Sequence, residues 1–163
     1  MNLPGPLAGV LSQWVSLYSN HAALRTVVVF AHVGGLLAAG GTAIAADRAL
    51  LLSLKQGDVD RLAQVTAIAR THRIVIAGLC VIVASGALLF AADVDTFLYS
   101  RVFWIKMTLV TLLLVNGAVL TATERLVRQG IDDVWGRLRI TAIISLALWF
   151  LITFAGVALT NVG

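Results

Sequence analysis

Four long apolar runs dominate the pattern of hydrophobic and polar positions. They cover residues 26–46, 74–92, 102–122 and 140–159. About 20 consecutive apolar residues form a helix long enough to cross the hydrocarbon core of a bilayer. A soluble helix bundle would instead carry charged outer faces on its helices, whereas these runs are apolar all round. The pattern therefore predicts an all-α fold with four membrane-spanning helices.

A shorter helix is expected before the first run. Residues 5–20 place apolar side chains at the i, i+3, i+4, i+7 spacing that gives a helix one apolar face. This segment is too short and too polar to cross a bilayer, and Trp14 and Tyr18 are of the type that lies at the depth of lipid headgroups. We expect an interfacial helix there.

The connections between the four runs are short, so consecutive spans should be antiparallel neighbours. No internal repeat or second domain is evident, and we expect residues 1–163 to form a single membrane domain, an up-and-down four-helix bundle. At the ends of the spans, Asp47, Arg48, His72, Glu124 and Arg125 are expected to form a ring of ion pairs.

Composition agrees with a membrane protein. The chain of 163 residues is 60% hydrophobic and 12% charged, against about 45–50% and 25% in soluble domains. The isoelectric point near 10.0 does not indicate nucleic-acid binding, because nine of the twelve Lys and Arg residues lie in two loops, residues 47–73 and 123–139. The positive-inside rule places these loops in the cytoplasm. We expect a multi-pass protein of the bacterial inner membrane with both termini extracytoplasmic and the lipid bilayer as its partner.

Two ionisable residues lie inside the apolar runs. His32 is six residues into the first run and Lys106 is four residues into the third. Both runs start from the extracytoplasmic side, so both side chains should lie roughly 6–9 Å below that boundary. Ionisable groups inside a bilayer are costly and are usually paired or functional. The two side chains are therefore the main functional candidates.

Each of the two side chains could take part in binding a cofactor. A neutral imidazole can bind haem iron or copper, so His32 is the candidate metal ligand. Lys106 could neutralise an acidic ligand, such as a porphyrin propionate, and could donate a proton, which makes it the candidate catalytic residue. Further candidates for cofactor binding are Arg101, in the outer loop, Gly35, on a row of small residues that also favours helix packing, and Asn116, which could equally hydrogen-bond across helices.

These residues resemble a known family. His32 is followed 16 positions later by Arg48, with glycines between them (HVGGLLAAGGTAIAADR); the second span opens RTHRIVIAGLCVIVASG and the third reads FWIKMTLVTLLLVNG. The order resembles four-span membrane protoporphyrinogen oxidases and the related copper resistance D-type membrane domains. The resemblance covers residues 26–120 and implies bound haem b, with His32 and Lys106 as the functional polar pair.

The chain also differs from the oxidase pattern. Gly and Ala follow His32 where the pattern has a Trp, Asp47 stands where it has a Pro, and Asn116 stands where it tends to have a His. The sequence is more similar to uncharacterised bacterial four-span proteins with a His-Gly-Gly-Asp first span and a Lys-Met-Thr-Leu third span. Such a likeness implies fold, and not activity.

We expect a protein that binds haem b or a related tetrapyrrole for redox chemistry near the extracytoplasmic side. Whether it is an enzyme is left open. One alternative is a module that binds or transports copper or another small cation through His32, Asp93 and Asp95. Another is a structural subunit or assembly factor, in which a homo-oligomer or a partner in a membrane complex docks on the small-residue face of the first span.

Overall fold

The computed structural model describes residues 5–54 and 58–162, and these residues form helices joined by short turns. The helices are α1 (Gly5–Asn20), α2 (Ala22–Ser53), α3 (Asp58–Ala69), α4 (His72–Ala92), α5 (Val94–Tyr99), α6 (Arg101–Arg128) and α7 (Trp135–Val162), with a 3-10 turn, η1, at Asp132–Val134. Four helices are long and apolar enough to cross a membrane. The predicted all-α bundle is confirmed.

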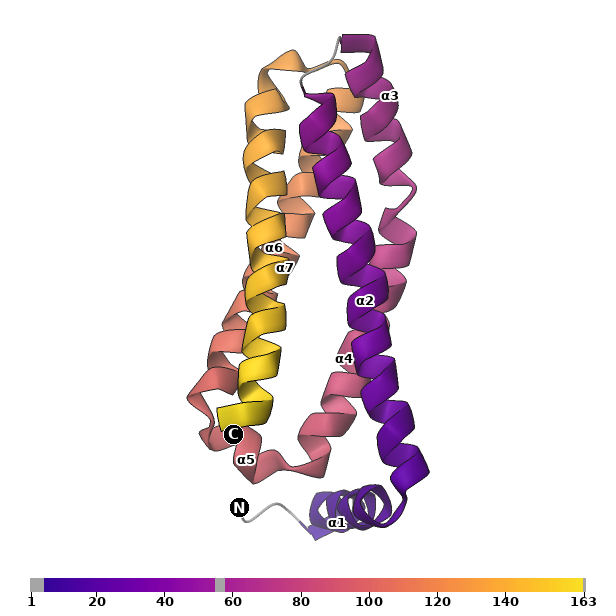
Figure 1. Cartoon of the computed structure of the whole chain (residues 1–163), viewed down its shortest axis with the longest axis vertical. Coiled ribbons are helices and arrows are strands. Elements are labelled where there is room, and N and C mark those ends of the chain that lie inside the picture. The colour runs from indigo at the N-terminus through magenta and orange to yellow at the C-terminus, as the bar shows by residue number, and fades with distance from the viewer. Residues whose placement is uncertain (1–4, 55–57, 163) are drawn as a thin grey trace.

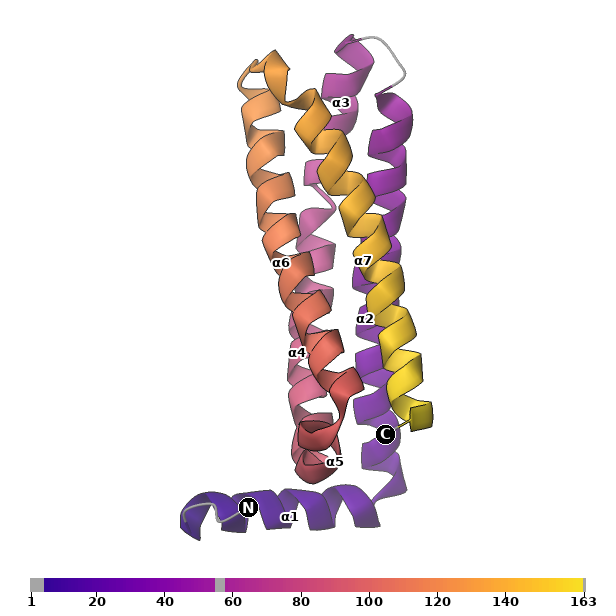
Figure 2. The ribbon, with the colours of Figure 1, turned by 90° about the vertical axis from the view of Figure 1, so that its left-hand side faces the viewer.

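The long helices run side by side, and α1 lies across one end of them (Figures 1 and 2). The start of α1 and the end of α7 lie at this end, which we call the α1 end. The ends of α2 and α6 lie at the opposite end, which we call the basic-loop end. Apolar side chains face outward along the spans, among them Phe30 at 75%, Leu37 at 70% and Phe154 at 72% exposed. In a bilayer these side chains would contact lipid.

Contacts between helices differ around the bundle. Helix α2 packs closely on α4 and on α7, α6 packs closely on α7, and α3 packs on α6. In contrast, α4 and α6 are consecutive spans joined by a short connection, yet they make few contacts. Consecutive spans are therefore antiparallel, as expected, and they pack closely in α2–α4 and α6–α7 but only loosely in α4–α6.

Small residues let α2 approach its neighbours. A Cβ atom added to Gly35 would come within 3.0 Å of the Ile82 side chain and 3.1 Å of the Gly78 carbonyl, and one added to Gly78 would come within 2.8 Å of the Ala39 Cβ. On the α7 side, Gly40 lies against the ring of the buried Trp149. The small-residue row of the first span thus serves close helix packing.

The second span is divided. Helix α3 ends at Ala69 and α4 begins at His72, and the Thr71 hydroxyl donates a 2.7 Å hydrogen bond to the Ile68 carbonyl at the break. Figure 2 shows the interruption between the two ribbons. Helical structure therefore continues beyond the apolar run toward the basic-loop end, with a change of direction at Arg70 and Thr71.

Helix α1 is attached firmly to the bundle. The Trp14 indole donates a 3.0 Å hydrogen bond to the Leu88 carbonyl near the end of α4, and Arg25 at the start of α2 donates a 2.7 Å hydrogen bond to the Ser19 carbonyl near the end of α1. His21 is the only residue between α1 and α2. These links hold α1 at a sharp angle to α2.

One polar contact joins α6 to α7. The buried Asn116 amide donates a 2.9 Å hydrogen bond to the Thr141 carbonyl. We expect Asn116→Leu to lower the free energy of unfolding by about 0.6–1.7 kcal/mol, the range measured for hydrogen bonds between membrane helices. Equilibrium unfolding in mixed micelles measures this. Thr108→Val is the control, because the Thr108 hydroxyl bonds only the Trp104 carbonyl of its own helix; an equal loss in both variants would contradict the prediction.

Candidate functional site

His32 lies on α2, in the half of the bundle nearer the α1 end, and its ring faces α4. The imidazole Nδ1 lies 3.1 Å from the Ser85 hydroxyl oxygen. Gly86, the next residue of α4, leaves room for the ring: a Cβ atom there would come within 3.3 Å of the His32 Cε1. Ser85 is buried and His32 is partly buried. Two small residues of α4 thus seat the imidazole.

The hydrogen bonds of Ser85 indicate the proton position on this ring. The Ser85 hydroxyl donates to the Val81 carbonyl at 2.6 Å, and the Ile82 carbonyl lies 3.2 Å away. A hydroxyl has one proton to donate, so its oxygen is left to accept from the His32 Nδ1–H. The lone pair of the ring then lies on Nε2, the nitrogen available to bind a metal or to accept a proton.

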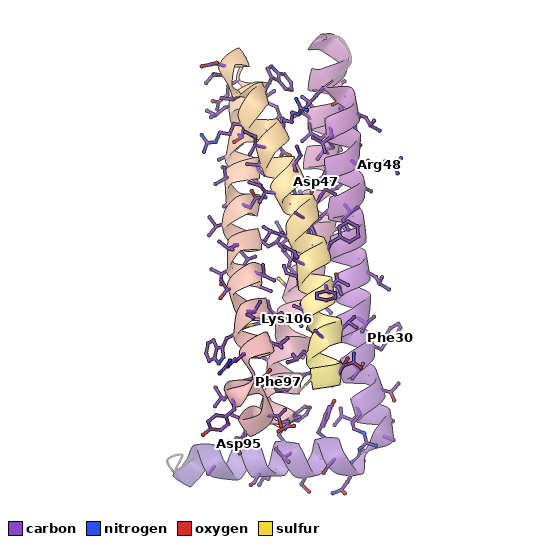
Figure 3. All side chains as sticks on the ribbon, turned by 60° about the vertical axis from the view of Figure 1, so that its left-hand side comes forward. Phe30, Asp47, Arg48, Asp95, Phe97 and Lys106 are labelled. Carbon is purple, nitrogen blue, oxygen red and sulfur yellow. The ribbon has the colours of Figure 1, made fainter. Side chains whose placement is uncertain are left out.

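Lys106 projects from α6 toward α7. Its Nζ would lie 3.7 Å from a Cβ atom added to Gly156, and the side chain is partly buried. Lys106 also lies close enough to His32 for the two groups to interact electrostatically. Figure 3 shows Lys106 in the half of the bundle nearer α1. The structure therefore brings the imidazole and the ammonium into the same half of the bundle.

The ammonium of Lys106 has no acidic partner among the residues that the structure describes. A lysine at this depth in a span normally pairs or reaches the interface. Lys106 is turned into the bundle, where the described side chains offer no counter-charge. This arrangement leaves a cation available to a negatively charged ligand.

Three phenylalanines border this region. Phe103, one turn before Lys106 on α6, stacks on Phe90 of α4 with ring centroids 5.5 Å apart and contacts Phe97 of α5 at 5.6 Å. The cluster joins α4, α5 and α6 at the α1 end, while α3 meets α6 at the basic-loop end. Between these contacts α4 and α6 are only weakly joined. The apolar pattern does not predict this cluster, whose only signal in the sequence is three phenylalanines near the ends of two runs.

The other three predicted site residues make contacts of other kinds. Gly35, one turn after His32 on α2, faces α4 in a packing contact, and Asn116 hydrogen-bonds across to α7 ten residues beyond Lys106. Arg101 is exposed at the first residue of α6. Gly35 and Asn116 therefore have structural contacts of their own, and Arg101 lies nearer the α1 end than the site.

The two acidic residues proposed for a cation site, Asp93 and Asp95, do not come together with His32 to form one. The Asp93 side chain accepts a 3.3 Å hydrogen bond from the Thr96 backbone at the start of α5, and Asp95 is exposed. Within the described ranges, no three His, Cys, Asp or Glu side chains are grouped so that they could hold a metal ion. The described residues therefore give no support to a copper site formed by His32, Asp93 and Asp95.

The expected ring of ion pairs at the basic-loop end takes another form. Asp47 and Glu124 are only 4% and 1% exposed, whereas Arg48 and Arg125 are exposed. His72 contacts Glu124, with its Nε2 3.7 Å from the Glu124 Oε2. The two acids thus turn into the bundle and the neighbouring arginines turn out, because adjacent residues point about 100° apart around an α-helix.

Comparison with known proteins adds no family to these observations: no family model, curated protein or solved structure matches the chain.

Proposed function

We propose that the protein binds haem b, or a related tetrapyrrole, for redox chemistry in the half of the membrane nearer the α1 end. The observation that carries the proposal is a pair of groups: an imidazole held with its Nε2 lone pair available, and a partly buried ammonium without a described counter-charge in electrostatic range of it. An iron porphyrin with acidic substituents satisfies both groups. When bound, it would supply one-electron chemistry at iron.

His32 would be the residue that binds the haem iron. A histidine that binds a metal usually donates its other ring N–H to an acceptor, which fixes the ring and makes the ligating nitrogen more basic. Ser85 is placed to be that acceptor, and its own proton is held by the Val81 carbonyl. The contact that would orient His32 for metal binding is therefore already present in the protein without a ligand.

Lys106 would pair with a propionate. A buried cation costs free energy unless it is paired, so a ligand carboxylate gains affinity there that it would not gain in water. Lys106 would also be the group that transfers a proton to or from the ligand. Arg101, five residues earlier on α6, is placed nearer the α1 end to meet a second carboxylate at the boundary.

The proposal also assigns each end of the bundle to one side of the membrane. The two basic loops would face the cytoplasm and the α1 end the extracytoplasmic side of a bacterial inner membrane, following the excess of Lys and Arg in those loops. The start of α1 and the end of α7 lie at the α1 end, so both termini would be extracytoplasmic.

The absorption spectrum of the purified protein tests the proposal. We expect the wild-type protein in mild detergent to show a Soret band, and the apoprotein to regain it when haem b is added. A protein that is colourless when pure and stays so after haem addition would refute haem binding. Stoichiometric membrane partners in that preparation would instead favour the structural-subunit alternative.

The role of Lys106 has its own test. We expect the wild-type apoprotein to bind haem b about tenfold more tightly than haem b dimethyl ester, since a charge-assisted hydrogen bond contributes roughly 1.5–3 kcal/mol. Lys106→Met should lose most of this preference and keep only the part that Arg101 contributes, as measured by titration at the Soret band. Arg25→Met is the control, because Arg25 is an exposed cation engaged by the Ser19 carbonyl. An unchanged preference in Lys106→Met would contradict the pairing.

A further inference from the structure

Two carboxylic side chains are buried in the bundle near its basic-loop end, away from His32 and Lys106. Asp47 of α2 is 4% exposed and Glu124 of α6 is 1% exposed. Figure 3 shows Asp47 in the half of the bundle remote from α1. The two groups lie close enough to repel each other when both are charged. Nothing in the proposed haem site uses them.

The polar surroundings of the two acids are sparse. Asp47 contacts the Ser145 hydroxyl of α7, and Glu124 contacts His72 of α4. Arg128, one turn further on α6, acts on Glu124 from an exposed position. Three buried oxygen atoms accept no hydrogen bond: Asp47 Oδ2, Glu124 Oε1 and Glu124 Oε2. Buried apolar residues lie within about one helical turn of the two acids: Leu50 on α2, and Leu120 and Val127 on α6.

Two ionised carboxylates cannot remain together in such a place at low cost. Each buried charge without hydrogen bonds costs several kcal/mol, and two like charges add their repulsion. A proton on one carboxyl removes one of the buried charges and, with it, the repulsion between the two groups. Arg128 attracts a negative charge on Glu124, but it does so from an exposed position where solvent weakens the attraction, so the cost of burying both charges remains.

We propose that Asp47 and Glu124 form a proton-binding site that carries one proton on its two buried carboxyl groups and exchanges it with solvent at the basic-loop end through His72. A proton suits the site better than a metal ion, because the described His, Cys, Asp and Glu side chains, His72 included, are not grouped so that three of them could hold a metal. The site stands independently of haem binding.

His72 supplies the route. Its side chain is 27% exposed, and its Nε2 lies 3.7 Å from the Glu124 Oε2. In the transfer, the N–H bond of a protonated imidazole breaks and an O–H bond forms on the Glu124 carboxylate, leaving a neutral imidazole that takes its next proton from water. The reverse sequence releases the proton to the same side.

Infrared spectroscopy of the full chain in lipid nanodiscs tests the site. We expect the wild-type protein to show the C=O stretch of a protonated carboxyl group at neutral pH. In Glu124→Gln the remaining Asp47 no longer opposes a second carboxylate, so the pH at which the band disappears should fall by about one unit or more. Asp47→Asn should act in the same direction on Glu124 and serves where Glu124→Gln does not fold. Asp95→Asn, at an exposed position, should leave the band unchanged.

Two further measurements complete the test. His72→Phe should slow the exchange of this carboxyl proton for deuterium several-fold, without removing the band; an unchanged exchange rate would overturn the route through His72. Absence of the band from the wild-type protein at neutral pH would overturn the site itself. A band that disappears when sodium replaces choline would also overturn it, by showing a cation site in place of a proton site.

Discussion

Replacing His32 with alanine is expected to abolish haem binding, the largest single effect on function that the structure predicts. The other two histidines of the chain lie elsewhere, His21 at the junction of α1 and α2 and His72 at the start of α4 near the basic-loop end. The Soret band of the purified protein should therefore be lost, and adding free imidazole to the apoprotein with haem should partly restore it, because the substitution leaves a space beside Gly86.

Two variants sharpen this prediction. Ser85→Ala removes the acceptor that holds the His32 Nδ1–H while leaving the ligand in place, and we expect about 10- to 100-fold weaker haem binding, the usual cost of losing such an orienting partner. His21→Ala removes an exposed histidine at the α1–α2 junction and should change nothing at the Soret band. A Soret band retained in His32→Ala would eliminate His32 as the ligand.

Replacing Gly35 with leucine is expected to disrupt the bundle. The added side chain would meet the backbone of α4 at Gly78 and Ile82, which cannot move aside as a flexible side chain could. Overpacking of this kind costs typically 1–3 kcal/mol and more where backbone must shift. We expect at least that loss in the free energy of unfolding, or a protein that no longer accumulates in the membrane. Haem affinity should fall with it, because α2 and α4 carry the His32–Ser85 contact.

The neighbouring residue is a matched control. A Cβ atom added to Gly34 meets nothing within 4 Å, so Gly34→Leu places the same side chain on the same helix without a collision. We expect Gly34→Leu to unfold at the same denaturant activity as the wild-type protein or slightly above it, since leucine favours helix over glycine. If Gly34→Leu and Gly35→Leu lowered the free energy of unfolding equally, the loss would come from leucine in helix α2 itself and not from a collision at the α2–α4 contact.

Much of the fold could be predicted from sequence because the bilayer imposes one length on every apolar run. The helices nevertheless extend beyond those runs, as in α6, which reaches Arg128, and α7, which starts at Trp135. Helical hydrogen bonding does not stop where hydrophobicity does. The weak α4–α6 contact was not predictable, since loop length limits how far apart two helices can be without specifying how closely they pack.

The candidate site was predictable only in part. Counting residues from the ends of the runs placed His32 and Lys106 at similar depth, and the structure places them within electrostatic range. Ser85 and the phenylalanine cluster depend on how α4 is rotated about its axis, which an all-round apolar pattern does not reveal. The burial of Asp47 and Glu124 was missed because both lie just beyond the apolar runs, where charged side chains usually reach water.

The attachment of α1 has a consequence for how the protein fits membranes of different thickness. Spans longer than the local hydrocarbon core usually tilt to match it. Here the Trp14–Leu88 and Arg25–Ser19 hydrogen bonds tie the bundle to α1, which lies across its end, so a bundle that tilted in a bilayer would have to tilt α1 with it. A thinner or thicker bilayer must then be accommodated at the far end, where the break at Arg70 and Thr71 lets α3 bend independently of α4.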